Sequence, residues 1–205
     1  MFTERWKCGS DLESYIDAVH ARRTTSTGLF AVKVHWDQLV LLRAEAGVGS
    51  EDPFMWEAPT EFLQRVFPNP LFIRITRRDL DRQAISLWRA GHSNIWSVNV
   101  GESLDIGADK TPYSFEGIDG LRRAIENGEL CWDRLTRERA GDALVVNYED
   151  LVAAFPRTVE SVAAHITPDV AVTVPAARTH RLSDEYSAEV LERYRSERRD
   201  RMRPS

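Results

Sequence analysis

Two adjacent arginines, Arg77 and Arg78, stand where an apolar run gives way to a helical pattern, in the segment LFIRITRRDLDRQAISLWRA at residues 71–90. The apolar residues before them favour a short buried strand, and Asp79 or Asp81 can cap the helix that follows. In an open α/β sheet, anionic ligands bind at such a corner, because the free N–H groups and the dipole of the helix point there. The segment therefore predicts a strand, a turn and a helix with two cations at the corner.

The side chains at this corner suit a phosphate group. A guanidinium such as that of Arg78 can bind a phosphate through two parallel hydrogen bonds, and Ser86, two helical turns further on, can add a hydroxyl. The alternative is a solvated turn in which the two arginines pair only with Asp79 and Asp81. The spacing of these residues leaves both interpretations open.

Lys33 and His35 share one face of a second predicted strand, Leu29 to Trp36. A lysine and a histidine two residues apart on one face are candidates for a catalytic role. The structural alternative is a lysine at the end of a sheet beside a hydrogen-bonded histidine.

A third strand is predicted over residues 143–146, and Tyr148 follows it directly. Residues 91–119 lack periodicity and are predicted to form an irregular insertion or acceptor loop, since long irregular stretches in compact domains are usually functional. The remaining elements are helices, predicted over residues 11–23, 37–46, 60–67, 80–90 and 121–139, from Pro156 onward, and in a C-terminal helix and tail over 183–205.

The composition fits one α/β domain over residues 1–205, with 42% apolar residues and a net charge of −5. The negative charge argues against a general nucleic-acid binder. Cys8 and Cys131 lack the spacing of a disulfide framework or a zinc site, so reduced thiols and no metal are expected. We find no apolar run long enough for a membrane span and no signal peptide, which predicts a cytoplasmic protein without a transmembrane segment.

Four stretches resemble the bacterial trehalose 2-sulfotransferase family, whose members use 3′-phosphoadenosine 5′-phosphosulfate (PAPS). The segment TRRDLDRQAISLWRA is similar to the family's TRRDK-x-x-QA-x-S-x-x-RA motif. GLFAVKVHW resembles its G-V-F-G-V-K-x-x-W strand, the YEDL corner at Tyr148 has a counterpart in sulfotransferases, and ARTHRLSD resembles its late R-Q-x-D segment.

The resemblance implies a role for each candidate residue. Arg78 and Ser86 would hold the 3′-phosphate of PAPS, Tyr148 would lie near the adenine and Arg181 would add a cation. In more distant sulfotransferases a K-x-H pair at such a strand supplies the transfer chemistry, which makes Lys33 and His35 the catalytic candidates. In the trehalose enzymes the base is thought to be a glutamate from an upstream loop.

The implied fold is a three-layer α/β fold, with a mostly parallel sheet and flanking helices, of the P-loop NTPase-like sulfotransferase type and incomplete at its N-terminus. The family begins with a P-R-S/T-G-S-T-like loop for the 5′-phosphosulfate, and no stretch here matches it. A late start site, an excised fragment and a short natural protein without transfer activity all remain open.

The predicted function is transfer of a sulfuryl group from PAPS to a hydroxyl of a carbohydrate, glycolipid or secondary-metabolite acceptor. The resemblance also implies a homodimer. The alternative is a non-catalytic module that binds a nucleotide or a partner. A nucleotide kinase is disfavoured because G-x-x-x-x-G-K-S/T is absent.

Overall fold

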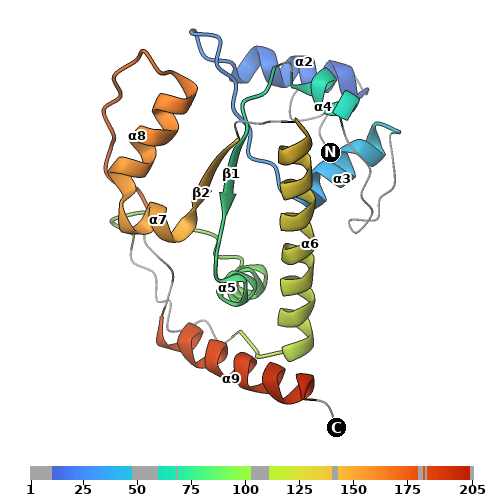
Figure 1. Ribbon diagram of the computed structural model, residues 1–205, viewed down its shortest axis with the longest axis vertical. Helices are drawn as coiled ribbons and strands as arrows, with labels where there is room; N and C mark the ends of the chain where they lie inside the picture. Colours follow the sequence, from blue (N-terminus) through green and yellow to red (C-terminus); the bar gives the residue numbers. More distant parts are fainter. Residues whose placement is uncertain are drawn as a thin grey trace. The chain divides into compact units, whose positions relative to one another are not determined.

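The computed structural model of the protein describes residues 11–47, 60–67, 69–102, 111–139, 143–179, 182 and 184–203 (Figure 1). The chain divides into two compact units. The first comprises Met1–Pro70 with Cys131–Arg139, and the second comprises Leu71–Leu130 with Ala140–Ser205. Helix α6 (Phe115–Arg139) belongs to both units, because its last nine residues are part of the first.

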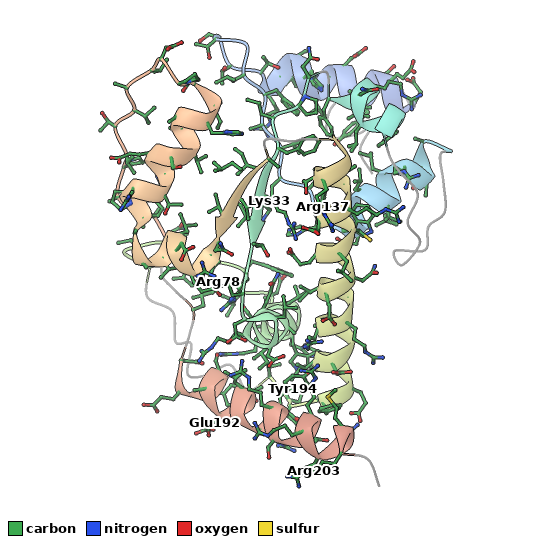
Figure 2. The ribbon with its side chains drawn as sticks, viewed as in Figure 1. Lys33, Arg78, Arg137, Glu192, Tyr194 and Arg203 are labelled. Carbon is green, nitrogen blue, oxygen red and sulfur yellow. The ribbon has the colours of Figure 1, made fainter. Side chains whose placement is uncertain are left out.

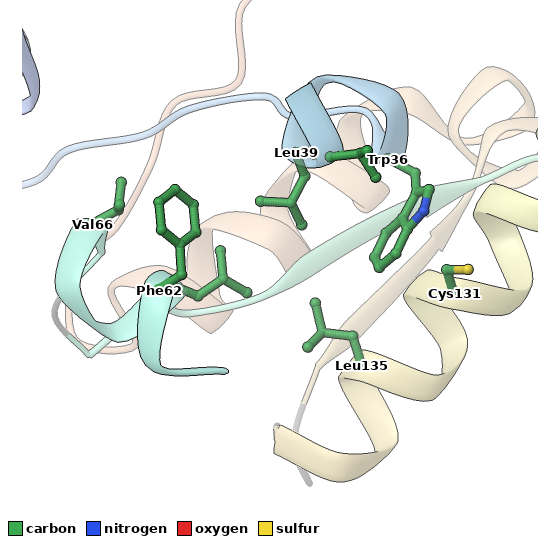
Figure 3. Close-up of a cluster of buried hydrophobic side chains, with 8 residues drawn as sticks. Trp36, Leu39, Phe62, Val66, Cys131 and Leu135 are labelled. Carbon is green, nitrogen blue, oxygen red and sulfur yellow. The ribbon is translucent and has the colours of Figure 1, made fainter. Parts of the chain in front are cut away.

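The first unit is helical. It contains α2 (Leu12–Arg23), α3 (Trp36–Glu45), α4 (Thr60–Val66) and the last turns of α6. Figure 3 shows its core, in which apolar side chains of α3 and α4 pack around Cys131 and Leu135 of α6. Cys131 is a buried free thiol, while Cys8 lies outside the described residues. The core joins residues that are far apart in the sequence.

The prediction of a strand over Leu29–Trp36 is wrong. Residues 29–35 form no strand, and Trp36 begins α3. The hydrogen bonds at the start of this segment are local: Thr25 N–H donates to the Leu29 carbonyl (2.8 Å), and Leu29 N–H donates to Thr25 Oγ1 (3.0 Å). Alternating apolar residues do not form a β-strand unless a neighbouring strand supplies the partners for its backbone hydrogen bonds.

The second unit contains a small parallel sheet of two strands, β1 (Ile73–Thr76) and β2 (Leu144–Asn147). Ile73 is paired with Leu144, and Thr76 is paired with Asn147. Both strands match predicted ones to within two residues. The mixed α/β class with a parallel sheet is therefore confirmed.

Helix α5 (Leu80–Ser93) follows β1, and Asp79 caps it by accepting a hydrogen bond from Arg82 N–H (3.1 Å). One of the two predicted caps is thus confirmed. The inner face of α5 packs in the second core with residues of α6 and of α9 (Glu185–Met202), and Gly117 of α6 allows close approach of the Trp88 ring. The buried members of this core are Ala84, Ile85, Phe115, Ile118, Val190, Leu191 and Tyr194.

Two short helices follow β2, namely α7 (Tyr148–Ala153) and α8 (Phe155–Ile166), with Pro156 in the first turn of α8 as predicted. In the segment predicted to be irregular over residues 91–119, α5 extends to Ser93 and α6 already begins at Phe115. Within the C-terminal helix and tail predicted over 183–205, the structure has α9 at Glu185–Met202.

Candidate functional site

The candidate site lies where β1 and β2 end. The two strands are parallel, and Thr76 at the end of β1 is paired with Asn147 at the end of β2. The segments that follow, Arg77–Arg78 and Tyr148–Asp150, therefore start side by side. Parallel pairing brings together two motifs that are about 70 residues apart in the sequence.

Arg78, labelled in Figure 2, is exposed at this edge. It pairs with Asp150 of α7. Its Nη1 and Nη2 donate to Asp150 Oδ1 and Oδ2 at 2.9 and 2.5 Å, and its backbone N–H donates to Glu149 Oε2 at 3.2 Å. The hydrogen bonds with Asp150 raise the pKa of Arg78, and those from Arg78 lower the pKa of Asp150. A carboxylate thus occupies the two-pronged guanidinium face that a phosphate would use.

Arg77 and Tyr148 form a second contact between the strand ends. The Arg77 guanidinium lies over the Tyr148 ring, 4.7 Å from its centroid, and Arg77 Nε is 3.8 Å from Glu149 Oε1. Tyr148 is half-buried, so part of its surface remains accessible. The proposed role of Tyr148 beside an adenine stays a prediction.

Asp79 and Asp81 pair with arginines other than Arg77 and Arg78. Arg195 of α9 donates to Asp79 Oδ1 and to Asp81 Oδ2, both at 2.9 Å. Arg122 of α6 donates to Asp81 Oδ1 at 3.0 Å. The solvated turn in which Arg77 and Arg78 pair with these two aspartates is therefore not the arrangement that the structure has.

An open cleft of about 390 Å³ lies beside this corner within the second unit. This volume is near the lower end of the usual range for small-molecule sites, about 300–1,000 Å³. Four of its lining residues are arginines, which makes it a positively charged cleft. Its lining residues are Arg78, Asp79, Leu80, Asp81, Arg122, Arg195 and Arg198.

The sequence alone did not reveal Arg122, Arg195 and Arg198 as part of this corner. Mixed charges along residues 185–203 indicated only a solvated helix. The one available signal was the pair of aspartates at the start of α5, because partly buried carboxylates need cationic partners from elsewhere in the chain.

Ser86 is exposed on α5, one helical turn beyond Arg82, and it is not among the residues that line the cleft. Arg181 lies outside the described residues. The structure thus describes Arg78, Ser86 and Tyr148 of the predicted nucleotide site, all within the second unit.

Lys33 and His35, the predicted catalytic residues, are both exposed in the first unit. His35 directly precedes α3, where its backbone N–H donates to Gln38 Oε1 at 3.1 Å. Their participation in one centre with Arg78 stays a prediction.

Two features are absent from the described ranges. These ranges contain no group of three or more histidine, cysteine and acidic side chains placed to hold a metal ion. In the same ranges, no helix combines the length and apolar character that a membrane span requires.

Comparison with known proteins identifies the family. Residues 6–197 match the sequence model of a family described as Stf0 sulphotransferase. The chain belongs to the Stf0 sulphotransferase family. The match includes both strands and all the candidate residues, so the resemblance on which the predicted roles rest is confirmed at the level of the family.

Two curated relatives are similar over most of the chain. A trehalose 2-sulfotransferase of Mycobacterium tuberculosis is 26% identical over 174 residues, which cover 84% of this chain and 63% of the relative. A trehalose 2-sulfotransferase of Mycolicibacterium smegmatis is 26% identical over 181 residues, covering 87% of this chain and 65% of the relative. The chain thus spans slightly less than two thirds of the length of these relatives.

Proposed function

We propose that this chain is the PAPS-binding part of a sulfotransferase that transfers a sulfuryl group to a hydroxyl of a carbohydrate, glycolipid or secondary-metabolite acceptor. The observation that carries the proposal is the position of Arg78. It lies at the carboxyl end of β1, beside an arginine-lined cleft, in a chain of the Stf0 sulphotransferase family. We further propose a three-layer, P-loop NTPase-like arrangement for the whole protein.

The residues at the corner suit the 3′-phosphate of PAPS. Arg78 can offer two parallel N–H donors, and the cleft carries four guanidinium groups and two carboxylates. The ion pair of Arg78 with Asp150 is exposed to solvent on both sides, and such pairs are weak. A phosphate can therefore replace the Asp150 carboxylate at little cost, with Ser86 as a further ligand and Arg181 as an additional cation.

Tyr148 would border the adenine. Its ring is held from one side by the Arg77 guanidinium, which fixes its orientation before a ligand arrives. The accessible part of the ring can then contact a base. Binding in this manner requires no metal.

When bound, PAPS supplies the sulfuryl group. In the proposed reaction, an acceptor hydroxyl oxygen forms a bond to sulfur while the bond between sulfur and the 5′-phosphate oxygen breaks. His35 would accept the hydroxyl proton, and Lys33 would balance the negative charge on the departing phosphate. The products are a sulfate ester and adenosine 3′,5′-bisphosphate.

Calorimetric titration with adenosine 3′,5′-bisphosphate tests the binding part of this proposal, with adenosine 5′-monophosphate as the control ligand. The wild-type chain should bind the bisphosphate, and Arg78→Ala should weaken this binding by about 30-fold or more, because the phosphate loses a two-pronged ionic contact. Arg157→Ala is the matched control, since Arg157 is an exposed arginine of α8 away from the cleft.

Equal affinities of wild type and Arg78→Ala for the bisphosphate would refute the assignment of Arg78. A transfer assay with PAPS and a panel of sugar acceptors then separates the two functions predicted from the sequence. Product formation supports the sulfotransferase, whereas bisphosphate binding without any product supports the non-catalytic module.

A further inference from the structure

Helix α9 is attached to α5 by an apolar contact that does not depend on its arginines. Val190, Leu191 and Tyr194 of α9 are buried in the second core together with Ala84 and Ile85 of α5. The Tyr194 hydroxyl, whose residue is labelled in Figure 2, donates to Asp119 Oδ1 of α6 at 2.8 Å. The residues of α9 that follow Tyr194 are therefore held beside the start of α5.

The Arg195 guanidinium is already engaged in hydrogen bonds within the protein. Its two hydrogen bonds bridge Asp79, the cap of α5, and Asp81 in the first turn. Asp81 also accepts a hydrogen bond from Arg122, which pairs with Glu126 as well. Both carboxylates of the cleft thus have hydrogen-bonded cationic partners without Arg198.

Arg198 differs from these residues. It lines the same cleft as Arg78, but its nearest carboxylate oxygen, Asp81 Oδ1, is 3.9 Å from its Nη1 and thus beyond hydrogen-bond distance. Across the part of the chain that the structure describes, its guanidinium makes no hydrogen bond. Its side chain is 31% exposed, so it is held near the cleft and remains accessible.

The charges of the cleft point to an anionic ligand. Four arginines and two aspartates line it, which leaves a formal excess of two positive charges. Asp150 and Glu126, from outside the lining, neutralise Arg78 and Arg122 in part, whereas Arg198 has only its longer ion pair with Asp81, at 3.9 Å, within the described residues. A phosphate monoester carries a charge of about −1.5 to −2 at neutral pH, so it would pair with Arg198 and, in place of Asp150, with Arg78.

We propose that Arg198 of α9 is a nucleotide-binding residue that contacts the 3′-phosphate from the side of α9, while Arg78 contacts it from the end of β1. This inference rests on the proposed function, because it uses the same phosphate. It adds a second cation that comes from the C-terminal helix, and it makes α9 part of the discrimination between nucleotides with and without a 3′-phosphate.

The test compares Arg198→Ala with Arg199→Ala in the whole chain, by calorimetric titration with adenosine 3′,5′-bisphosphate, adenosine 5′-monophosphate and inorganic phosphate. Arg199 is the matched control, since it is the next arginine of α9, is exposed and does not line the cleft. Arg198→Ala should weaken bisphosphate binding by about 10- to 100-fold, as expected for loss of a hydrogen bond to a charged group.

Three further readouts separate a direct contact from a structural effect. The affinity for the 5′-monophosphate and the melting temperature should be unchanged in Arg198→Ala, and Arg199→Ala should bind the bisphosphate like wild type. Arg198→Lys should restore part of the affinity, because it returns the charge and a single donor without the planar fork.

The outcomes distinguish this inference from the proposed function. Loss of bisphosphate affinity in Arg78→Ala with none in Arg198→Ala overturns the role of Arg198 and leaves the proposed function in place. Binding of inorganic phosphate that depends on Arg198, without binding of either nucleotide, supports the anion contact and overturns the nucleotide. A wild-type chain that binds none of the three ligands overturns both.

Discussion

Two arginine–aspartate pairs at opposite ends of α5 use the same two-pronged geometry in different surroundings. Arg89, near the end of the helix, donates to both carboxylate oxygens of Asp184 at 2.6 and 2.9 Å, and its side chain is 8% exposed. Arg78, just before the helix, donates to both oxygens of Asp150, and its side chain is 56% exposed.

The comparison shows that burial, more than geometry, separates an ion pair that holds the fold from one that is available to a ligand. Around Arg89 and Asp184 further groups complete the site: Ser187 also donates to Asp184, and the Tyr186 ring lies below the guanidinium. Breaking such a pair leaves a partly buried charge, whereas water can replace either partner of the exposed pair.

The largest effect should come from Arg89→Ala. We expect it to lower the free energy of unfolding by about 3 kcal/mol, because the Asp184 carboxylate loses its partner in a partly buried position. Urea unfolding followed by circular dichroism measures this change. Arg78→Ala is the matched comparison and should unfold nearly like wild type; equal destabilisation by the two variants would contradict the distinction between the pairs.

A second prediction concerns acid stability. Burial would raise the pKa of Asp184, but hydrogen bonds from Arg89 and Ser187 outweigh it and lower this pKa to about 2, below its ordinary value of 3.8. The unfolded chain therefore takes up the proton first, so the stabilisation is complete above about pH 4 and is lost as the pH falls toward 2. The loss should be on the order of 2 kcal/mol.

Urea unfolding at several pH values between 5 and 2, in wild type and in Asp184→Asn, isolates this contribution as the difference between the two curves. Asp150→Asn should flatten the curve much less, because solvent screens the exposed pair. Parallel curves for wild type and Asp184→Asn would show that Asp184 does not contribute to the acid sensitivity.

The smallest effect should come from Asp150→Asn, and it should appear in binding. The asparagine no longer competes as an anion for the Arg78 guanidinium, so the affinity for adenosine 3′,5′-bisphosphate should rise about threefold. Its stability should hardly change. Calorimetric titration measures this effect, and weaker binding in the variant would mean that Asp150 orients Arg78 for its ligand.

The local sequence was sufficient to predict the secondary structure around Arg78. The order of strand, turn and helix and the cap at Asp79 depend on neighbouring residues, whose chemistry the sequence displays directly. The residues that pair with Arg78 and Asp79 could not be predicted from neighbouring sequence. Asp150 is 72 residues from Arg78, and Arg195 is 116 residues from Asp79. Their contacts follow from the parallel pairing of β1 and β2 and from the packing of α9 on α5.

In the segment before Trp36, by contrast, the local pattern led to a wrong prediction. Its alternating pattern suits a strand, but a strand also requires a partner, which the pattern does not specify. The pattern therefore predicted a face shared by Lys33 and His35, while the structure has a connection without regular secondary structure that leads into α3.

Helix α6 has a consequence for how the chain can fold during its synthesis. The first unit buries Cys131 and Leu135 of α6 against apolar residues of α3 and α4. As the chain emerges from the ribosome, the N-terminal helices must wait until the end of α6 is complete before their core can close, by which time β1 and α5 have already been made. The first unit thus begins earlier in the sequence than the second, but its core can form only after the end of α6 has been synthesised.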